Sequence, residues 1–253
     1  HATFMHVLRI PAGHKFVGLK ILQMNRIDHF FQKIQLWIRS KPLLYRFTLG
    51  IRALLAIGFI PTGMVKLLGY RFTTMSPESD IGAFFEVMYQ SGIYWNFLGF
   101  TQVLAGILVL IPAASALGAL LFLGIMMNIF LITISYDFNF TPFITFQMLL
   151  ASIWLVIWDY DRFRNLIFKN ELMPAGTGRE YRKLAAGLQP LPRLTLENYY
   201  ERTVYITGTA AGILFFGMLR GPILPEGFSI VLLIVCSICF ISAIVFSFRN
   251  AKG

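Results

Sequence analysis

The sequence predicts an all-α, multi-pass membrane protein, from its composition, its recurring apolar segments and the placement of its charges. Of the 253 residues, 57% are hydrophobic and only 13% are charged, whereas soluble domains carry about 25% charged residues. Apolar stretches near the length that crosses a bilayer core of about 30 Å recur along the chain. The formal net charge of +10 lies beside these stretches, with no basic stripe that would indicate a nucleic-acid partner.

Residues 1–47 form a basic segment that we expect on the cytoplasmic side, with an amphipathic helix over residues 26–40. The charges of Arg26, Lys33 and Arg39 lie off its apolar face, a pattern typical of a helix lying in the membrane interface. The alternative is a helix that packs on a protein partner, and Pro42 ends the segment in either case. The apolar face consists of Ile27, Phe30, Phe31, Ile34, Trp37 and Ile38.

Six apolar segments are each long enough to be a transmembrane helix. The first four, within residues 48–160, predict a four-helix bundle, and residues 161–202 form a hydrophilic cytoplasmic loop. Residues 203–253 then supply a transmembrane hairpin and a short cytoplasmic tail. A second surface helix is predicted over 76–92, with Ser76 as its N-cap. The spans cover residues 48–70, 94–111, 117–135, 142–158, 203–219 and 228–248.

The distribution of Lys and Arg predicts the orientation. Segments 1–52, 159–202 and 248–253 carry 19 of the 22 basic residues. Basic loops stay on the cytoplasmic side, so both termini are expected in the cytoplasm, in a bacterial inner membrane.

Three stretches within residues 48–160 carry a resemblance to a known family. They read RALLAIGFIPTGMVKL from Arg52, GFTQVLAGILVLIP from Gly99 and LGALLFLGIMMNIF from Leu117. These stretches resemble the DoxX family of small bacterial membrane proteins. The resemblance implies a four-helix bundle and an association with membrane redox complexes, some of which oxidise thiosulfate with a quinone. One departure is Gln102, where DoxX-like sequences commonly carry an acidic residue.

Lys66 is the sharpest single candidate for a functional residue, because an ionisable group in a membrane span is expensive and often functional. Glu86 or Asp80 of the following surface helix could form an ion pair with it. The functional interpretation is a binding or proton-handling site at the outer mouth of the bundle. The alternative is an amine that reaches the interface or forms a structural ion pair.

Polar side chains inside the spans suggest a pocket that could hold the head group of a quinone, whose two carbonyls need hydrogen-bond donors. The alternative is that these amides and hydroxyls join helices, as polar groups do in membrane bundles. The predicted pocket residues are Lys66, Gln102, Asn128, Thr145 and Gln147.

Other motifs indicate packing rather than chemistry. Gly208 and Gly212 form a close-packing motif, which could join the fifth span to the sixth or to another subunit. Cys236 and Cys239 are predicted to be free buried thiols, because thiol exchange needs a thiolate. No cluster of His, Cys, Asp and Glu has metal-ligand spacing, and no catalytic set can be assigned.

These observations favour an accessory or quinone-associated subunit of a membrane redox complex. The expected partners are membrane lipids and other membrane subunits, and quinone is the one cofactor considered. A small-molecule or ion transporter is the first alternative, and it would need polar groups continuous through the bilayer. A structural subunit without a redox role and a membrane enzyme with Lys66 as base are the others.

Overall fold

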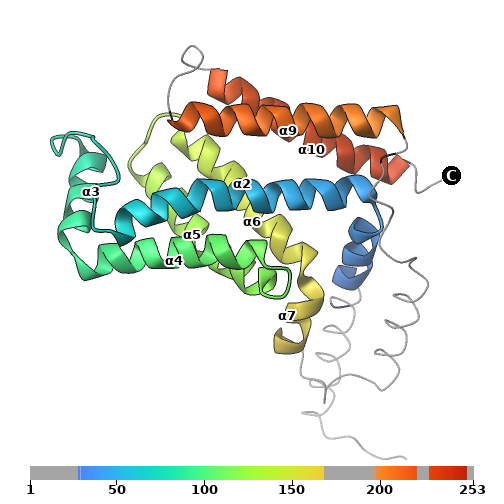
Figure 1. Ribbon diagram of the computed structural model, residues 1–253, viewed down its shortest axis with the longest axis horizontal. Helices are drawn as coiled ribbons and strands as arrows, with labels where there is room; N and C mark the ends of the chain where they lie inside the picture. The colour runs from blue at the N-terminus through green and yellow to red at the C-terminus, as the bar shows by residue number, and fades with distance from the viewer. Residues whose placement is uncertain (1–27, 29, 168–195, 197, 221–227, 250–253) are drawn as a thin grey trace, which may run out of the picture.

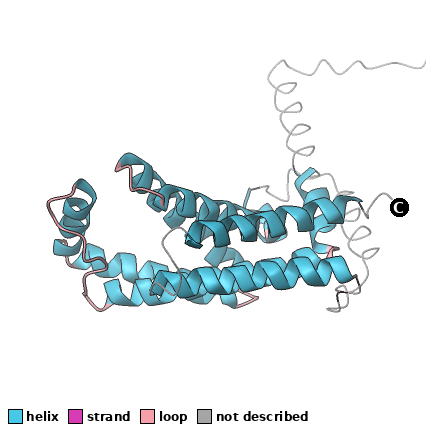
Figure 2. Cartoon of the chain, turned by 90° about the horizontal axis from the view of Figure 1, so that it is seen from above, coloured by secondary structure: helices cyan, strands magenta, loops and turns pink. Residues whose placement is uncertain are grey.

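The computed structural model describes residues 28, 30–167, 196, 198–220 and 228–249, and every regular element among them is an α-helix (Figures 1 and 2). A helix over residues 30–39, here called the N-terminal helix, comes first. The others are α2 (Pro42–Leu67), α3 (Asp80–Gln90), α4 (Ile93–Leu110), α5 (Ser115–Ser135), α6 (Thr141–Trp158), α7 (Tyr160–Ile167), α9 (Tyr199–Arg220) and α10 (Phe228–Arg249).

Five helices of the described chain are long and apolar enough to cross a membrane, which confirms the all-α membrane class. They are α2, α4, α5, α6 and the Ile230–Arg249 part of α10. Helix α9 was predicted as a further span but is not among the five. Its last turns include side chains that the structure does not describe. A sixth span at α9 therefore stays a prediction.

Helices α2, α4, α5 and α6 form a four-helix unit, with α2 against α4 and α5 against both α4 and α6 (Figure 1). The pair α9 and α10 packs along α2. Helix α3 lies at one end of the unit, whereas the N-terminal helix and α7 lie at the other. We call these the α3 end and the α7 end. The arrangement agrees with the predicted bundle of four helices plus a hairpin.

An apolar core fills the middle of the four-helix unit. The rings of Phe59 and Phe122 meet edge to face with their centroids 4.6 Å apart, a favoured aromatic geometry. The buried residues of this core are Leu55, Ala56, Phe59, Ala105, Val109, Ala119, Phe122, Met126 and Leu155.

Helix α2 begins six residues before the predicted start of the first span at Thr48. Pro42 occupies the first helical position, after Lys41 as N-cap. Proline fits that position because its missing N–H would have no partner there. Pro42 therefore starts a helix as well as ending the segment before it, and Pro61 is accommodated within α2.

The N-terminal helix contacts the rest of the chain, and its predicted place in the membrane interface stays a prediction. It packs on the rest of the chain, with Leu36 and Ile38 buried. The Trp37 ring stacks on Phe248 of α10 at a centroid distance of 4.0 Å. Phe30 is 60% exposed and is the part of the predicted face that stays open. Protein packing is therefore observed, and the partner is this same chain.

The N-cap of α3 is Ser79, not Ser76. The Ser79 hydroxyl accepts a hydrogen bond from the backbone N–H of Gly82 at 3.2 Å. Ser76 instead shapes the preceding turn, where its carbonyl accepts from the Ser79 hydroxyl at 2.9 Å.

In the predicted cytoplasmic loop, the first residues form α7. The rest of that loop, apart from Leu196 and residues 198–202, lies outside the described residues.

Candidate functional site

Glycines bring the backbones of α2 and α4 into direct contact near the α3 end. A Cβ atom on Gly99 would lie 2.3 Å from the Leu67 nitrogen and 2.6 Å from the Gly63 carbonyl oxygen. A Cβ on Gly63 would lie 2.9 Å from the Cβ of Gln102. Small residues permit this approach between membrane helices. The contact fixes Lys66, on the last turn of α2, beside the first half of α4.

The structure brings together two of the predicted site residues, Lys66 and Gln102. Each is only 7% exposed. The Lys66 ammonium donates a hydrogen bond from Nζ to Gln102 Oε1 at 2.9 Å. Lys66 forms no ion pair with any described residue, so its charge is solvated by an amide rather than neutralised by a carboxylate.

Aromatic rings form the rest of the surroundings of the Lys66 amine. Its Nζ lies 4.2 Å from the ring centroid of Phe72 and 5.5 Å from that of Trp95. The negative face of an aromatic ring attracts a cation, most strongly where water is excluded. Trp95 is fixed in turn, because its Nε1 donates to the Tyr70 carbonyl at 2.9 Å. We call Lys66, Gln102, Phe72 and Trp95 the Lys66 site.

The predicted ion pair of Lys66 with Glu86 or Asp80 is wrong. Glu86 accepts from Arg71 Nη2 at 2.7 Å, and Asp80 is exposed in the first turn of α3. The reason is that Lys66 points into the helix contact, where aromatic rings occupy the space beside it. Arg71 lies beyond the end of α2 and is exposed, so it reaches the carboxylate of α3.

The Lys66 site has hydrogen-bond donors that are not used, on both Lys66 and Gln102. An ammonium carries three N–H donors, and one is bonded to Gln102. Within the described chain, Gln102 Nε2 makes no hydrogen bond. A ligand that completes this arrangement must therefore bring acceptor oxygens, as a carbonyl or an anion does.

The remaining three predicted pocket residues do not join the Lys66 site through any hydrogen bond of the described chain. Asn128 is exposed and bonds the Gly124 carbonyl of its own helix. Thr145 shares a hydrogen bond of 2.9 Å with Thr133 of α5, and Gln147 donates to Ser237 of α10 at 2.8 Å. A small polar pocket that includes these three residues stays a prediction. Thr145 and Gln147 join helices, which was the alternative interpretation.

The packing motifs behave as expected. A Cβ on Gly208 would lie 3.0 Å from Cys239, and one on Gly212 would lie 3.1 Å from Leu54. The motif therefore packs α9 against both α10 and α2 within the chain. Both cysteines are free thiols. Among the described residues, no group of His, Cys, Asp and Glu could hold a metal ion.

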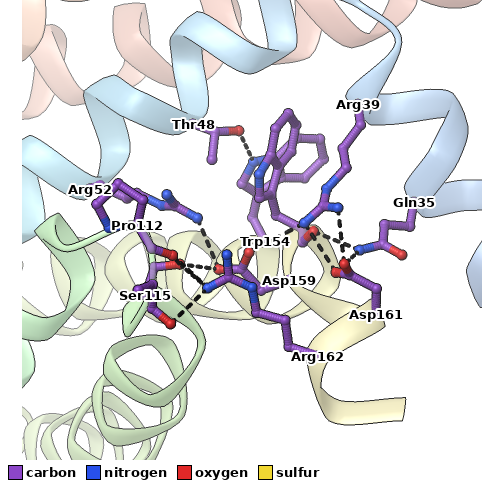
Figure 3. Close-up of polar contacts among 12 residues, drawn as sticks. Gln35, Arg39, Thr48, Arg52, Pro112, Ser115, Trp154, Asp159, Asp161 and Arg162 are labelled. Atoms are coloured by element: carbon purple, nitrogen blue, oxygen red, sulfur yellow. Dashed lines mark hydrogen bonds and ion pairs between the residues drawn. The ribbon is translucent and has the colours of Figure 1, made fainter. Parts of the chain in front are cut away.

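A second polar cluster lies at the α7 end (Figure 3) and was not predicted. Its centre is Asp159, which is 2% exposed. The Asp159 carboxylate accepts from Arg52 Nη2 and Ser115 Oγ, both at 2.9 Å, and lies 3.4 Å from Arg39 Nη2. We call it the Asp159 cluster. The available signal was an aspartate directly after an apolar span, with Arg52 near the start of another.

Further contacts tie the Asp159 cluster to the surrounding elements. Asp161 of α7 pairs with Arg39 at 3.1 Å and accepts from Gln35 of the N-terminal helix. Arg162 Nη1 donates to the Pro112 carbonyl and, at 3.2 Å, to Ser115 Oγ. The cluster therefore joins the N-terminal helix, α2, the start of α5 and the α6–α7 junction.

The comparisons with known proteins give one relative. It is YwoB of Bacillus subtilis (strain 168), an uncharacterized protein. YwoB is 33% identical to this chain over 127 residues. The alignment covers 47% of this chain and 80% of that protein. No family model and no solved structure matches the chain.

Proposed function

The chain belongs to the same family as YwoB of Bacillus subtilis, and we propose that it is a quinone-associated accessory subunit of a membrane redox complex. The Lys66 site binds the head group of the quinone. The DoxX-like stretches of α2, α4 and α5 support the association with redox assemblies. The single observation that carries the binding proposal is a buried ammonium that pairs with no carboxylate of the described chain.

The chemistry of the Lys66 site suits a quinone carbonyl. Lys66 Nζ and Gln102 Nε2 are donors with capacity left, and a quinone head group presents only acceptor oxygens. The flat ring of a quinone is compatible with neighbours such as Phe72 and Trp95, since aromatic rings favour stacked or edge contacts. Binding requires the Phe72 ring to move partly away from the amine, because its centroid lies 4.2 Å from Nζ.

The proposal includes an orientation in the bacterial inner membrane. With both termini in the cytoplasm, the α7 end faces the cytoplasm and the α3 end faces outward. The described basic residues support this placement, because the N-terminal helix, the start of α2, α7 and the end of α10, which carry most of them, lie at the α7 end (Figure 1). The Lys66 site then lies near the outer surface of the membrane.

The transporter alternative is less well supported. A transported polar solute needs polar groups through the bilayer, but the core around Phe59 and Phe122 separates the Lys66 site from the Asp159 cluster. The proposal therefore gives the two polar regions separate roles.

Native purification in a mild detergent, followed by mass spectrometry of proteins and extracted lipids, tests the proposal. We expect redox subunits in stoichiometric amounts and a bound quinone. The amount of bound quinone should be lower in Gln102→Leu. A variant at the far end, Asp161→Asn, should keep it. A lone oligomer without quinone would contradict the proposal and make solute flux the next assay.

A further inference from the structure

The α7 end carries three basic side chains for which no salt bridge is formed within the described part of the chain. Lys41 precedes α2, Arg46 lies in its second turn and Arg249 ends α10. None of the three forms an ion pair with a described residue. They differ in this from Arg39 and Arg52, whose charges are taken up by the Asp159 cluster.

Aromatic rings hold two of these cations in place without removing their charge. Lys41 Nζ lies 5.9 Å from the ring centroid of Trp37. The Arg46 guanidinium lies 5.5 Å from that of Tyr205 on α9. Arg46 Nε is buried and has no hydrogen-bond partner. A buried donor without an acceptor is unfavourable, so this atom marks a place where an acceptor is missing.

The same rings bring the three helices together. Trp37 stacks on Phe248 of α10 at 4.0 Å, and Tyr205 meets Phe47 of α2 edge to face at 5.8 Å. On α9, Tyr200 packs on Phe246 at 4.7 Å. The patch therefore forms where the start of α2, the start of α9 and the end of α10 meet (Figure 1). We call Lys41, Arg46, Arg249, Trp37 and Tyr205 the basic aromatic patch.

The position of the patch specifies what can reach it. It lies at the ends of α2 and α10, both of which are apolar enough to span a membrane, so it lies at the level of lipid head groups. Basic residues at this level attract anionic lipids, and aromatic residues favour the interface.

We propose that the basic aromatic patch binds the phosphate of an anionic phospholipid head group. Lys41 supplies an ammonium, and Arg46 supplies a guanidinium whose planar donors suit phosphate oxygens. The inference does not rest on the proposed quinone site, which lies at the other end of the bundle.

Native mass spectrometry of the full chain tests this site. The protein is titrated in detergent with phosphatidylglycerol, and in parallel with phosphatidylcholine. We expect the wild type to retain phosphatidylglycerol preferentially. The affinity for it should fall roughly tenfold or more in Lys41→Gln/Arg46→Gln, since each basic residue adds to anionic lipid binding. Equal affinity in wild type and double variant would overturn the proposal.

Matched variants distinguish loss of the patch from a general loss of positive charge and from misfolding. Lys33→Gln removes one exposed charge of the N-terminal helix outside the patch and should leave the affinity unchanged. Arg46→Lys keeps the charge and should retain most of the binding, which covers the case in which Arg46→Gln does not fold. An equal loss in Lys33→Gln, or displacement of the lipid by inorganic phosphate at the same concentration, would contradict a lipid site.

Discussion

Two cations of the same helix, the partly buried Arg52 and the buried Lys66, have opposite surroundings. Arg52 lies 2.9 Å from the Asp159 carboxylate, within a cluster that joins four parts of the chain. Lys66 has an amide and two aromatic rings. A neutralised cation in a membrane bundle stabilises the assembly of its helices, whereas one that keeps its charge and its free donors is available for a ligand. The comparison therefore assigns structure to the α7 end and binding to the α3 end.

The largest expected effect is at the α7 end. Asp159→Asn removes the carboxylate that neutralises Arg52, and breaking a buried pair costs about 3–5 kcal/mol. We expect a loss of that order in the free energy of unfolding, measured by denaturant titration in detergent micelles. Asp161→Asn is the control, since Asp161 is 30% exposed and its loss should be smaller. Equal losses would break the assignment of Asp159 as the centre.

The next effect concerns the glycine contact that positions the Lys66 site. Gly99→Ala would place a Cβ against backbone atoms of α2 that cannot move aside. Overpacking of this kind costs about 1–3 kcal/mol, which thermal unfolding can detect. The Cβ of Gly124→Ala would lie in open space, so this variant should keep the stability of the wild type. A tolerated Gly99→Ala would contradict the close approach of α2 and α4.

A smaller effect is expected for the ion pair that holds the loop before α3. Arg71 and Glu86 lie 2.7 Å apart, but the Arg71 side chain is 61% exposed. Exposed pairs contribute at most about 1 kcal/mol and are screened by salt. Arg71→Gln should therefore lower the unfolding temperature slightly, and less so in high salt. A large, salt-independent loss would show that this loop is part of the stabilising structure.

The smallest effect on stability is expected for Lys66→Met. Removing a buried charge that has no carboxylate partner relieves its desolvation, which offsets the lost hydrogen bond to Gln102. The free energy of unfolding should stay within about 1 kcal/mol of wild type. Denaturant titration beside Asp159→Asn compares the two cations directly. A loss as large as that of Asp159→Asn would make Lys66 a structural residue and end the contrast.

The membrane helices could be predicted from the sequence because a bilayer requires long apolar segments, which composition reveals. Helices α4, α5, α6 and α10 begin and end within two residues of the predicted spans. Their rotations could not be predicted, since nearly every face of such a helix is apolar. The N-terminal helix differs, because its apolar face is clear from the sequence. What that face packs on depends on the tertiary structure, in which Leu36 and Ile38 are buried.

The candidate site could be predicted in part. Lys66 and Gln102 stand out because polar groups are rare in apolar spans, and they are hydrogen-bonded in the structure. Their separation from Thr145 and Gln147 depends on which helices touch, which spacing along the chain does not reveal. The pairing of Arg52 with Asp159 joins residues of two separate helices, so it required the tertiary structure.

The most direct test of ligand binding at Lys66 is a titration of wild type and Lys66→Met with a short-chain quinone, followed by tryptophan fluorescence. Trp95 lies 5.5 Å from Lys66 Nζ and would be quenched by a bound quinone. We predict saturable quenching in wild type and a dissociation constant at least about tenfold higher in Lys66→Met, since hydrogen bonds to charged groups contribute about 1.5–3 kcal/mol. Arg71→Gln should match wild type. The same dissociation constant in Lys66→Met and wild type would contradict a quinone site at Lys66.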